Sequence, residues 1–451
     1  MSMYRRRFLT AGGAAVAAVT VGARTAGASA SADSTTNAGA SPSPNITVDF
    51  TKVLTKVDPL GIGWTCSTYK GGTGAANINA SATWKATLAA LGAGHVRIPL
   101  RWNHGDPGSS AGGAQTSGDA DTYIKNIRGM GALPFVIYGG DSSDNGGLNG
   151  SDAAAFVAHY NGAGGSANGG PVKYWVIGNE PDVSGGTSAY LSALPGIVSA
   201  MHGADPSVVI SAPAAAWFDT GLLQAAATID GVGILSYHAY NGGDAAPGGF
   251  PNESAYHANI ATLKTYKPGV LYGVEEANWH YVGGAAEFFD WHNTCFIADA
   301  AGQVLSAGGH FTQYSDSNGP LGLLNDGGGQ GQPGSLGTPL PAYWGLGIWT
   351  GMAGQFKKYS AAMVPVTSTL AGTAVSAFAC DNGKVVLVNK QAAAQPAVIG
   401  LVGRTSGTYE VWATQPGSPT APIHKVAFGQ YSGSQISYTV PAGTAVSVDI
   451  S

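Results

Sequence analysis

Two short stretches of the chain end an apolar run abruptly in carboxylates, where reactive side chains are expected. Residues 175–182 read Trp-Val-Ile-Gly-Asn-Glu-Pro-Asp, and residues 271–279 read Leu-Tyr-Gly-Val-Glu-Glu-Ala-Asn-Trp. Because proline cannot continue a central strand, Glu180 should lie at the carboxyl end of a strand. Two carboxyl groups that face each other can share proton transfer and nucleophilic attack between them.

The elements around these stretches alternate between strands and helices. Between residues 57 and 356, short apolar runs rich in β-branched residues precede helix-length segments rich in Ala and Leu, which indicates βαβ units. Eight strands favour a (β/α)8 barrel over an open sheet, whose first turn would need a phosphate-binding glycine pattern. The eight runs are residues 60–64, 95–100, 133–138, 174–177, 208–211, 234–237, 271–274 and 310–314.

In such a barrel the fourth and seventh strands end on nearly opposite sides of the mouth, so their carboxyl groups can approach across its centre. Glycoside hydrolysis needs this arrangement, with attack on the sugar when the gap is about 5 Å and inversion through water when it is roughly 6.5 Å or more. Because side chains alternate along a strand, we expect only one of Glu275 and Glu276 to point inward. For Glu180 the alternative is a salt-bridged surface acid.

With these motifs the chain resembles the retaining glycoside hydrolases of clan A over about 300 residues. The resemblance implies Glu180 as acid/base, Asn179 as partner of the sugar 2-hydroxyl, and a glutamate of the seventh strand as nucleophile. The family pattern of Glu followed two positions later by Asn matches Glu276 and Asn278, which leaves Glu275 as a supporting carboxylate. The Gly-Asn-Glu-Pro-Asp wording and the appended β-sandwich are most similar to the xylosidase, arabinofuranosidase and glucuronidase groups.

Other residues at strand ends are candidates for the same site. Related enzymes carry a His or Tyr at the end of the sixth strand, which matches His238 and Tyr240; a packing role is the alternative for His238. Arg97 is flanked by apolar residues, and an inward arginine is costly unless it is paired with a carboxylate. The resemblance places such an arginine near the nucleophile, and a purely structural ion pair is the alternative.

Aromatic residues near strand ends could offer flat faces to a sugar, and tryptophan offers the largest. We expect Trp279 and Trp64 to contact substrate, and Trp344 and Trp349 to belong to the core. The full set at strand ends is Trp64, Trp102, Tyr138, Trp217, Tyr240, Trp279 and Tyr314.

These residues predict double displacement on a plant or microbial poly- or oligosaccharide, without a metal or organic cofactor. One alternative is a metal-dependent barrel hydrolase that uses His95, His238 and His310, although His95 and His310 open their strands at the face opposite the chemistry. The other is a non-catalytic polysaccharide-binding protein on a glycosidase-like barrel.

The barrel is predicted to span residues 45–356. Long polar segments follow several strands, at residues 103–119, 139–149, 241–252 and 315–337, and loops at this end build the active face of a barrel. Residues 357–451 alternate short strands with turns and predict a β-sandwich. Residues 46–54 also alternate, and could pair with that C-terminal sheet.

The composition narrows the class of protein further. Charged residues make up 10% and the net charge is -5, which argues against a protein that neutralises nucleic-acid phosphates. Cys66, Cys295 and Cys380 are too few for a disulfide scaffold. A Cys66–Cys295 bridge is one possibility, and unpaired buried thiols are the favoured one.

The N-terminus resembles a twin-arginine signal peptide, residues 1–30. Arginines at 5–7 precede an apolar run at 11–23 and small residues at 26–30. This run is too short to span a bilayer. We therefore expect export by the Tat translocase, a linker at residues 31–44, and a secreted protein with no membrane association after cleavage.

Overall fold

The computed structural model describes residues 42–66, 78–79, 81–100, 102–103, 106–107, 117–139, 148–183, 186–240, 250, 254–281, 286–315, 321–327, 331–370, 375–415 and 422–451. Residues 44–451 form one compact unit. The expected signal peptide and most of the linker lie outside the described residues, as does most of the expected loops at 103–119, 139–149 and 241–252. No described helix is long and apolar enough to cross a membrane.

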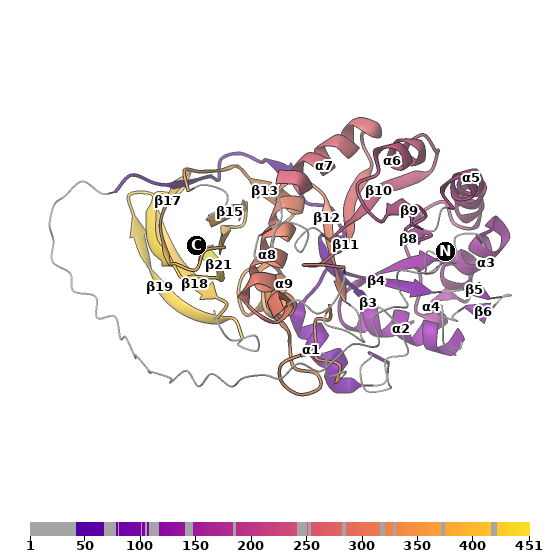
Figure 1. Cartoon of the computed structure of the whole chain (residues 1–451), viewed down its shortest axis with the longest axis horizontal. Helices are drawn as coiled ribbons and strands as arrows, with labels where there is room; N and C mark the ends of the chain where they lie inside the picture. Colours follow the sequence, from indigo (N-terminus) through magenta and orange to yellow (C-terminus); the bar gives the residue numbers. More distant parts are fainter. Residues whose placement is uncertain are drawn as a thin grey trace, which may run out of the picture. The chain divides into compact units, whose positions relative to one another are not determined.

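Eight parallel strands close into a barrel, which confirms the expected fold class (Figure 1). Each runs as predicted, with ends that differ by a few residues. Around the barrel the order is β3 (Ile62–Cys66), β4 (His95–Leu100), β7 (Leu133–Tyr138), β8 (Tyr174–Ile177), β9 (Val209–Ala215), β10 (Val232–Ala239), β11 (Leu271–Ala277) and β12 (His310–Ser315), which pairs with β3. A small hairpin, β5 (Trp102–Asn103) and β6 (Asp106–Pro107), follows β4.

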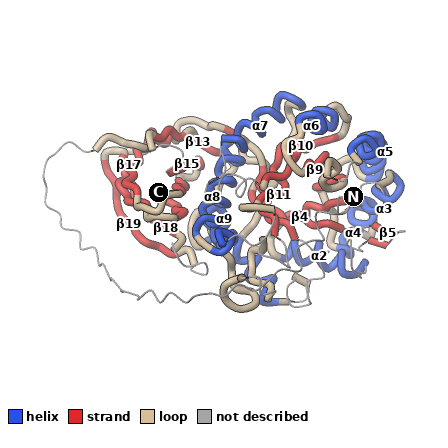
Figure 2. Tube along the Cα trace, viewed as in Figure 1, coloured by secondary structure: helices blue, strands red, loops and turns tan. Residues whose placement is uncertain are grey.

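Helices surround these strands (Figure 2). Local sequence sets their ends: Ser81 accepts from the amide of Trp84 at the start of the first helix, and Gly92 ends that helix with a φ of 72°. They are α1 (Ala82–Leu91), α2 (Ser117–Gly129), α3 (Gly150–Asn161), α4 (Gly165–Asn168), α5 (Thr187–Ala204), α6 (Thr220–Ala227), α7 (Ser254–Tyr266), α8 (Trp291–Ser306) and α9 (Pro341–Thr350), with short 3-10 turns at Ala286–Phe289 and Met352–Gly354.

Two sheets form the β-sandwich, and their strands pair antiparallel except for one parallel pair. One has the order β14-β1-β17-β20 and the other β19-β18-β21-β16-β15-β13-β2. The early strands β1 (Ile46–Asp49) and β2 (Thr55–Lys56) join them, β1 beside β17 and β2 beside β13. The others are β13 (Ala362–Val364), β14 (Val366–Ser368), β15 (Val375–Cys380), β16 (Lys384–Asn389), β17 (Gln395–Val402), β18 (Ser406–Ala413), β19 (His424–Ser432), β20 (Gln435–Val440) and β21 (Thr444–Ile450).

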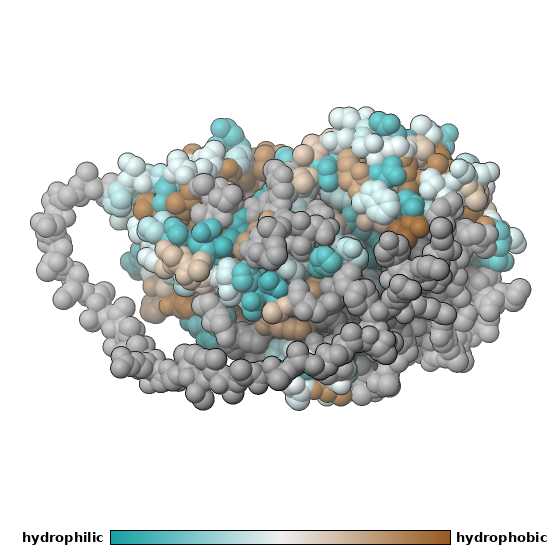
Figure 3. Space-filling view, in the orientation of Figure 1, coloured by the Kyte–Doolittle hydropathy of each residue, from teal (hydrophilic) through white to brown (hydrophobic). Residues whose placement is uncertain are grey.

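The apolar residues form a large cluster and smaller separate ones. The large cluster fills the layer between barrel strands and helices and continues to Phe378 and Val386 of the sandwich strands, and a separate cluster with Ile399 and Leu387 lies between the sandwich sheets. Trp344 and Trp349 are buried in α9, as expected. The three cysteines are buried free thiols, and burial raises the pKa of Cys66 to about 12. On the face in Figure 3, polar and apolar residues of the described surface are intermixed.

Candidate active site

Glu180 is held at the mouth of the barrel by an uncommon backbone conformation. Its φ of 48° lies in the left-handed region that residues other than glycine rarely adopt. Its amide donates to the carbonyl of Ala214 at 3.0 Å. Ala214 is the residue at which the pairing of β9 with β10 slips, and its φ is 50°. Two residues in costly conformations therefore fix the Glu180 backbone, as is common at reactive sites.

Both glutamates of the adjacent pair point into the barrel, which corrects the expectation that only one could. β10 pairs Tyr237 with Val274 and then His238 with Glu276, so the register skips Glu275. Such a bulge breaks the strict alternation of side chains along a strand. Glu275 has no exposed surface, whereas Glu276 is 6% exposed.

Arg97 on β4 connects these carboxylates with the first motif. Its Nη1 donates to Oε1 of Glu276 at 2.7 Å, and its Nη2 donates to Oδ1 of Asn179 at 2.8 Å. Its Nε lies 3.4 Å from Oε2 of Glu275. Because the guanidinium is fully buried, its charge must be balanced locally, and the two carboxylates do so.

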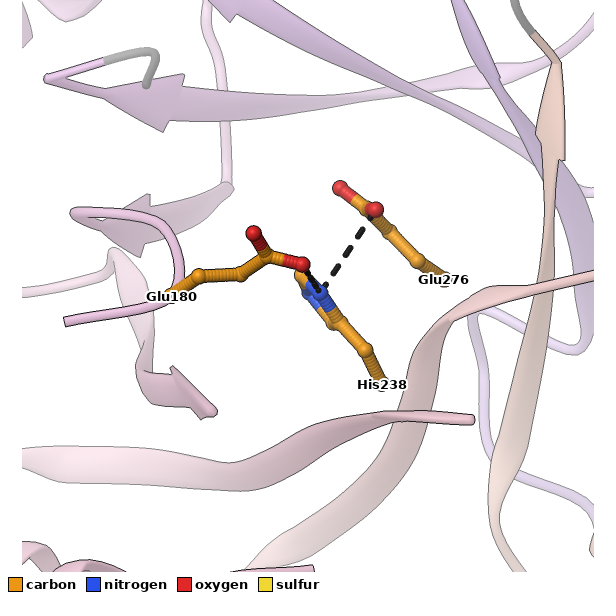
Figure 4. Close-up of side chains that lie close together, drawn as sticks. All are labelled: Glu180, His238 and Glu276. Atoms are coloured by element: carbon orange, nitrogen blue, oxygen red, sulfur yellow. Dashed lines mark hydrogen bonds and ion pairs between the residues drawn. The ribbon is translucent and has the colours of Figure 1, made fainter. Parts of the chain in front are cut away.

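His238 and Tyr240 lie at or just after the end of β10, and together they contact the carboxylates of Glu180 and Glu276. Nδ1 of His238 lies 3.0 Å from Oε1 of Glu180 and 3.5 Å from Oε2 of Glu276 (Figure 4). Its Nε2 lies 3.4 Å from Nη2 of Arg97, and since a guanidinium only donates, Nε2 accepts and Nδ1–H donates to Glu180. The Tyr240 hydroxyl donates to Oε2 of Glu276. Burial, together with the Glu276 charge, raises the pKa of Tyr240, so this hydroxyl keeps its proton.

The carboxyl groups of Glu180 and Glu276 are close. An oxygen of Glu180, an oxygen of Glu276 and a ring nitrogen of His238 all lie within 4.8 Å of one another. Figure 4 shows the two carboxyl groups pointing toward each other from opposite sides. Direct attack on a sugar is expected at a separation of about 5 Å, and a wider gap is needed to admit a water between acid and sugar.

The same three groups are also a candidate metal site. Among the described residues, Glu180, His238 and Glu276 each offer one ligand atom, and zinc binds such ligands. Arg97 donates to one oxygen of Glu276 and Tyr240 to the other. A metal ion would therefore have to share or displace these donors and lie close to a buried guanidinium.

His95 and His310 do not join His238 in a common ligand set. The ring nitrogens of His95 lie 2.9 Å from the carbonyl oxygen of Leu60 and 2.8 Å from the hydroxyl of Thr312. Burial, with the nearby His310 charge, lowers the pKa of His95 to about 3. The trio expected of the metal-dependent alternative is therefore not assembled.

Glu275 lies between two cations. Ser211 donates to its Oε1, and Nε2 of His310 lies 3.9 Å from the same oxygen. Burial raises the pKa of Glu275, but His310, Arg97 and Ser211 outweigh it and lower the pKa to about 2. Burial lowers the pKa of His310, but Asp58, 3.0 Å from its Nδ1, and Glu275 outweigh it and raise the pKa to about 9. Sequence reasoning missed Asp58 and Ser211, whose only signal was a polar residue beside or within an apolar strand.

Two tryptophans expected to contact sugar are instead part of the core. Trp64 is 4% exposed and faces the helices, because Gly63, the alternate position on β3, faces His95 inside the barrel. Trp279 is 2% exposed, and its ring packs edge-on against Phe250 and Phe296.

Asn278 is also corrected from a substrate contact to a structural residue. Its side-chain amide donates to the carbonyls of Tyr314 and Leu321, and its oxygen accepts from the amide of Trp279. It has no exposed surface, and it fastens the segment that follows β12.

Trp217 keeps an open face beside the Glu180 turn. It is 52% exposed, and the preceding residue, Ala216, donates its amide to the carboxylate of Asp182 at 3.0 Å. Burial raises the pKa of Asp182. Of the expected platforms with described side chains, Trp217 is the most exposed tryptophan, whereas the side chain of Trp102 lies outside the described part.

Comparison with known proteins yields matches in structure. No family model and no curated protein matches the sequence. An α-L-arabinofuranosidase from Thermotoga maritima superposes with a TM-score of 0.69 at 15% identity, covering 90% of this chain and 99% of its own. A GH30 endoxylanase from Clostridium papyrosolvens gives 0.64 at 14%, covering 90% and 99%. A bifunctional glucanase-xylanase from a metagenome library gives 0.64 at 17%, covering 91% and 99%. The chain thus shares its barrel-and-sandwich fold with these structures.

Proposed function

We propose that this chain is an exported retaining glycoside hydrolase that cleaves a plant or microbial poly- or oligosaccharide by double displacement. The observation that carries this proposal is the separation of the carboxyl groups, with oxygens of Glu180 and Glu276 within 4.8 Å. This distance favours direct attack by a carboxylate over attack by an interposed water.

In the first step Glu180 gives its proton to the glycosidic oxygen while Glu276 attacks the anomeric carbon. The bond to the leaving group breaks, and a glycosyl ester forms on Glu276. Arg97 and Tyr240 each donate to one oxygen of Glu276 and orient it for attack. The side-chain oxygen of Asn179 accepts from Arg97, and we assign the contact with the sugar 2-hydroxyl to this residue.

In the second step Glu180, now a carboxylate, takes a proton from water, and the resulting hydroxide equivalent cleaves the ester. Esterification has removed the negative charge of Glu276, so Glu180 no longer faces a second carboxylate. Nδ1–H of His238 donates to Glu180 and stabilises this charged form. Water is therefore activated only after the leaving group has departed.

The proposed substrate class is drawn from the structural neighbours, and model substrates can test it. Wild-type protein should cleave at least one aryl glycoside of xylose, arabinose, glucose, galactose or glucuronic acid. Glu180→Gln and Glu276→Gln should each lower kcat by about a thousandfold or more. Asp121 is a partly buried carboxylate that contacts His159, and Asp121→Asn is the matched control that should leave kcat unchanged.

Three outcomes would contradict this proposal. Wild-type protein that binds polysaccharide but cleaves none of the aryl glycosides would favour the non-catalytic alternative. Activity that disappears with a chelator and returns with zinc would favour a metal at Glu180, His238 and Glu276. Loss of cleavage in only one of the two glutamine variants would remove the two-carboxylate mechanism.

Export is proposed from the N-terminal sequence alone. Replacing the arginines at 5–7 by lysine should retain the protein inside the producing cell, as a Tat signal requires its arginine pair. Export that is unchanged by this replacement would contradict the proposed route.

A further inference from the structure

Beneath the nucleophile, buried charges of alternating sign extend toward the other end of the barrel. In order they are Asp58, His310, Glu275, Arg97 and Glu276. The first four are called the buried charge chain below. The side chains of Asp58, His310, Glu275 and Arg97 have no exposed surface. Glycoside cleavage by two carboxylates has no evident need of the first three.

We propose that Asp58, His310 and Glu275 are positioning residues which hold Arg97, and through Arg97 set the orientation and charge of Glu276. This inference rests on the proposed function, because it assigns a supporting role to residues around its nucleophile. It extends the site to the floor of the barrel, to residues that do not touch Glu180.

The geometry of Arg97 is the first support. Its two terminal nitrogens are committed to Glu276 and Asn179, so its Nε is the group left to anchor it. Nε faces Oε2 of Glu275 at 3.4 Å, an ion contact without hydrogen-bond geometry. Such a contact acts through charge, so Glu275→Gln removes it even though the shape of the side chain is kept.

The placement of Glu275 is the second support. The bulge interrupts the regular hydrogen-bond ladder of β11. As a result, the two successive carboxylates reach the same guanidinium, that of Arg97. A buried carboxylate is costly unless it is paired, and Glu275 meets Arg97 on one oxygen and His310 with Ser211 on the other. His310 is in turn held by Asp58, whose other oxygen accepts from the amide of Leu60.

The charge state of His310 follows from its neighbours. It faces Asp58 and Glu275, and its ring meets that of His95 edge-on at 5.8 Å. Two carboxylates favour the imidazolium, whereas burial and any charge on His95 oppose it. His95 is neutral, since burial lowers its pKa to about 3. His310 is therefore the second cation that the floor of the site requires.

Two substitutions of opposite charge provide the test. Glu275→Gln removes a negative charge near Glu276, so the acidic limb of the kcat/KM profile, measured with the best aryl glycoside, should move to lower pH by roughly half a unit or more. His310→Gln removes a positive charge, so the same limb should move to higher pH. Each should lower kcat by about tenfold or more while KM changes less than about threefold.

Opposite shifts separate charge from packing, because a variant that merely loosens the core gives no shift of defined sign. Ser211→Ala is the control for a lost hydrogen bond to Glu275 without a change in charge, and its limb should stay near that of wild type. The Asp121→Asn control removes a partly buried carboxylate that pairs with His159, and should change neither kcat nor the limb. Limbs that move in the same direction, or remain in place, in Glu275→Gln and His310→Gln would overturn the proposal.

A second measurement needs no activity. Nitrogen NMR of the histidine rings in the wild-type chain should show one imidazole, assigned by its absence in His310→Gln, that stays charged at pH 8. In Glu275→Gln this ring should lose its proton at a lower pH. A neutral His310 at pH 7 would overturn the proposal. If no aryl glycoside is cleaved, the proposed function fails, and the ring titration still decides whether the buried charge chain exists. If a variant does not fold, a wild-type spectrum without any ring that stays charged at pH 8 would still overturn the proposal.

Discussion

The core of the barrel and the core of the sandwich are built on opposite principles. Between the sandwich sheets lies a cluster of buried apolar side chains, with Leu387 and Ile399 at 0% exposure. Inside the barrel, Arg97, Glu275 and His310 are equally buried and depend on one another for compensation. Since an apolar core of similar volume is often at least as stable as buried ion pairs, the barrel charges indicate a role beyond stability.

The largest difference between the effect on activity and the effect on stability is expected at Glu276, the proposed nucleophile. Glu276→Gln should abolish at least about 99.9% of aryl glycoside cleavage. The free energy of unfolding should change little, because Arg97 keeps its contacts with Glu275 and Asn179. Parallel kinetics and urea unfolding would measure both effects. A loss of unfolding free energy large enough to explain the loss of activity would mean that Glu276 is mainly structural.

The reverse pattern is expected in the sandwich. Leu387→Ala should lower the free energy of unfolding by about 2–5 kcal/mol, because it leaves a cavity among buried apolar side chains. At 25 °C the kcat of the remaining folded protein should stay within about twofold of wild type. Urea unfolding and initial rates would test this. A large loss of kcat would show that the sandwich core also supports the reacting groups.

The division between the two cores follows from what a single sequence carries. The eight barrel strands could be predicted because each is a short apolar run between helix-length segments, and Glu180 because Pro181 ends its strand. Pairing of β1 with β17 joins residues more than 350 positions apart, and the alternation at 46–54 gave only a hint of it.

The errors arose where the backbone departs from regular geometry. The bulge at Glu275 turns both glutamates inward, and no residue type in that stretch announces a bulge. Trp64 and Trp279 follow apolar strands as a sugar platform would, yet which face a tryptophan occupies depends on neighbours elsewhere in the chain. Asp58 contacts His310 and Ser211 contacts Glu275 across long stretches of sequence, so these pairs could be recognised only in the folded barrel.

The pH dependence of stability sharpens the contrast within the barrel. The pKa of His310 is raised to about 9 in the folded chain from an ordinary 6.5, so its stabilising contribution is present below about pH 6.5 and lost as pH rises through 9. Between pH 6.5 and 9 wild-type protein should lose stability with a slope of up to about 1.4 kcal/mol per pH unit more than His310→Gln. Urea unfolding across this range measures it, and parallel curves for the two proteins would contradict a charged His310.

The smallest effect is expected at the rim. Trp217→Ala should raise KM for an oligosaccharide about two- to tenfold with kcat nearly unchanged, because a stacked aromatic face contributes about 0.5–1.5 kcal/mol. Trp349→Ala, in the core of α9, should instead lower stability. An unchanged KM in Trp217→Ala, measured over a series of oligosaccharide lengths, would place the sugar elsewhere.

Trapping the covalent intermediate would identify the carboxylate that attacks the sugar. A 2-fluoro glycoside of the sugar that the wild-type enzyme cleaves best should slow ester hydrolysis and leave one sugar attached per chain, detectable by intact mass and located by peptide mapping. We expect the label on Glu276. A label on Glu275, or turnover that yields the inverted anomer without any labelled protein, would contradict it.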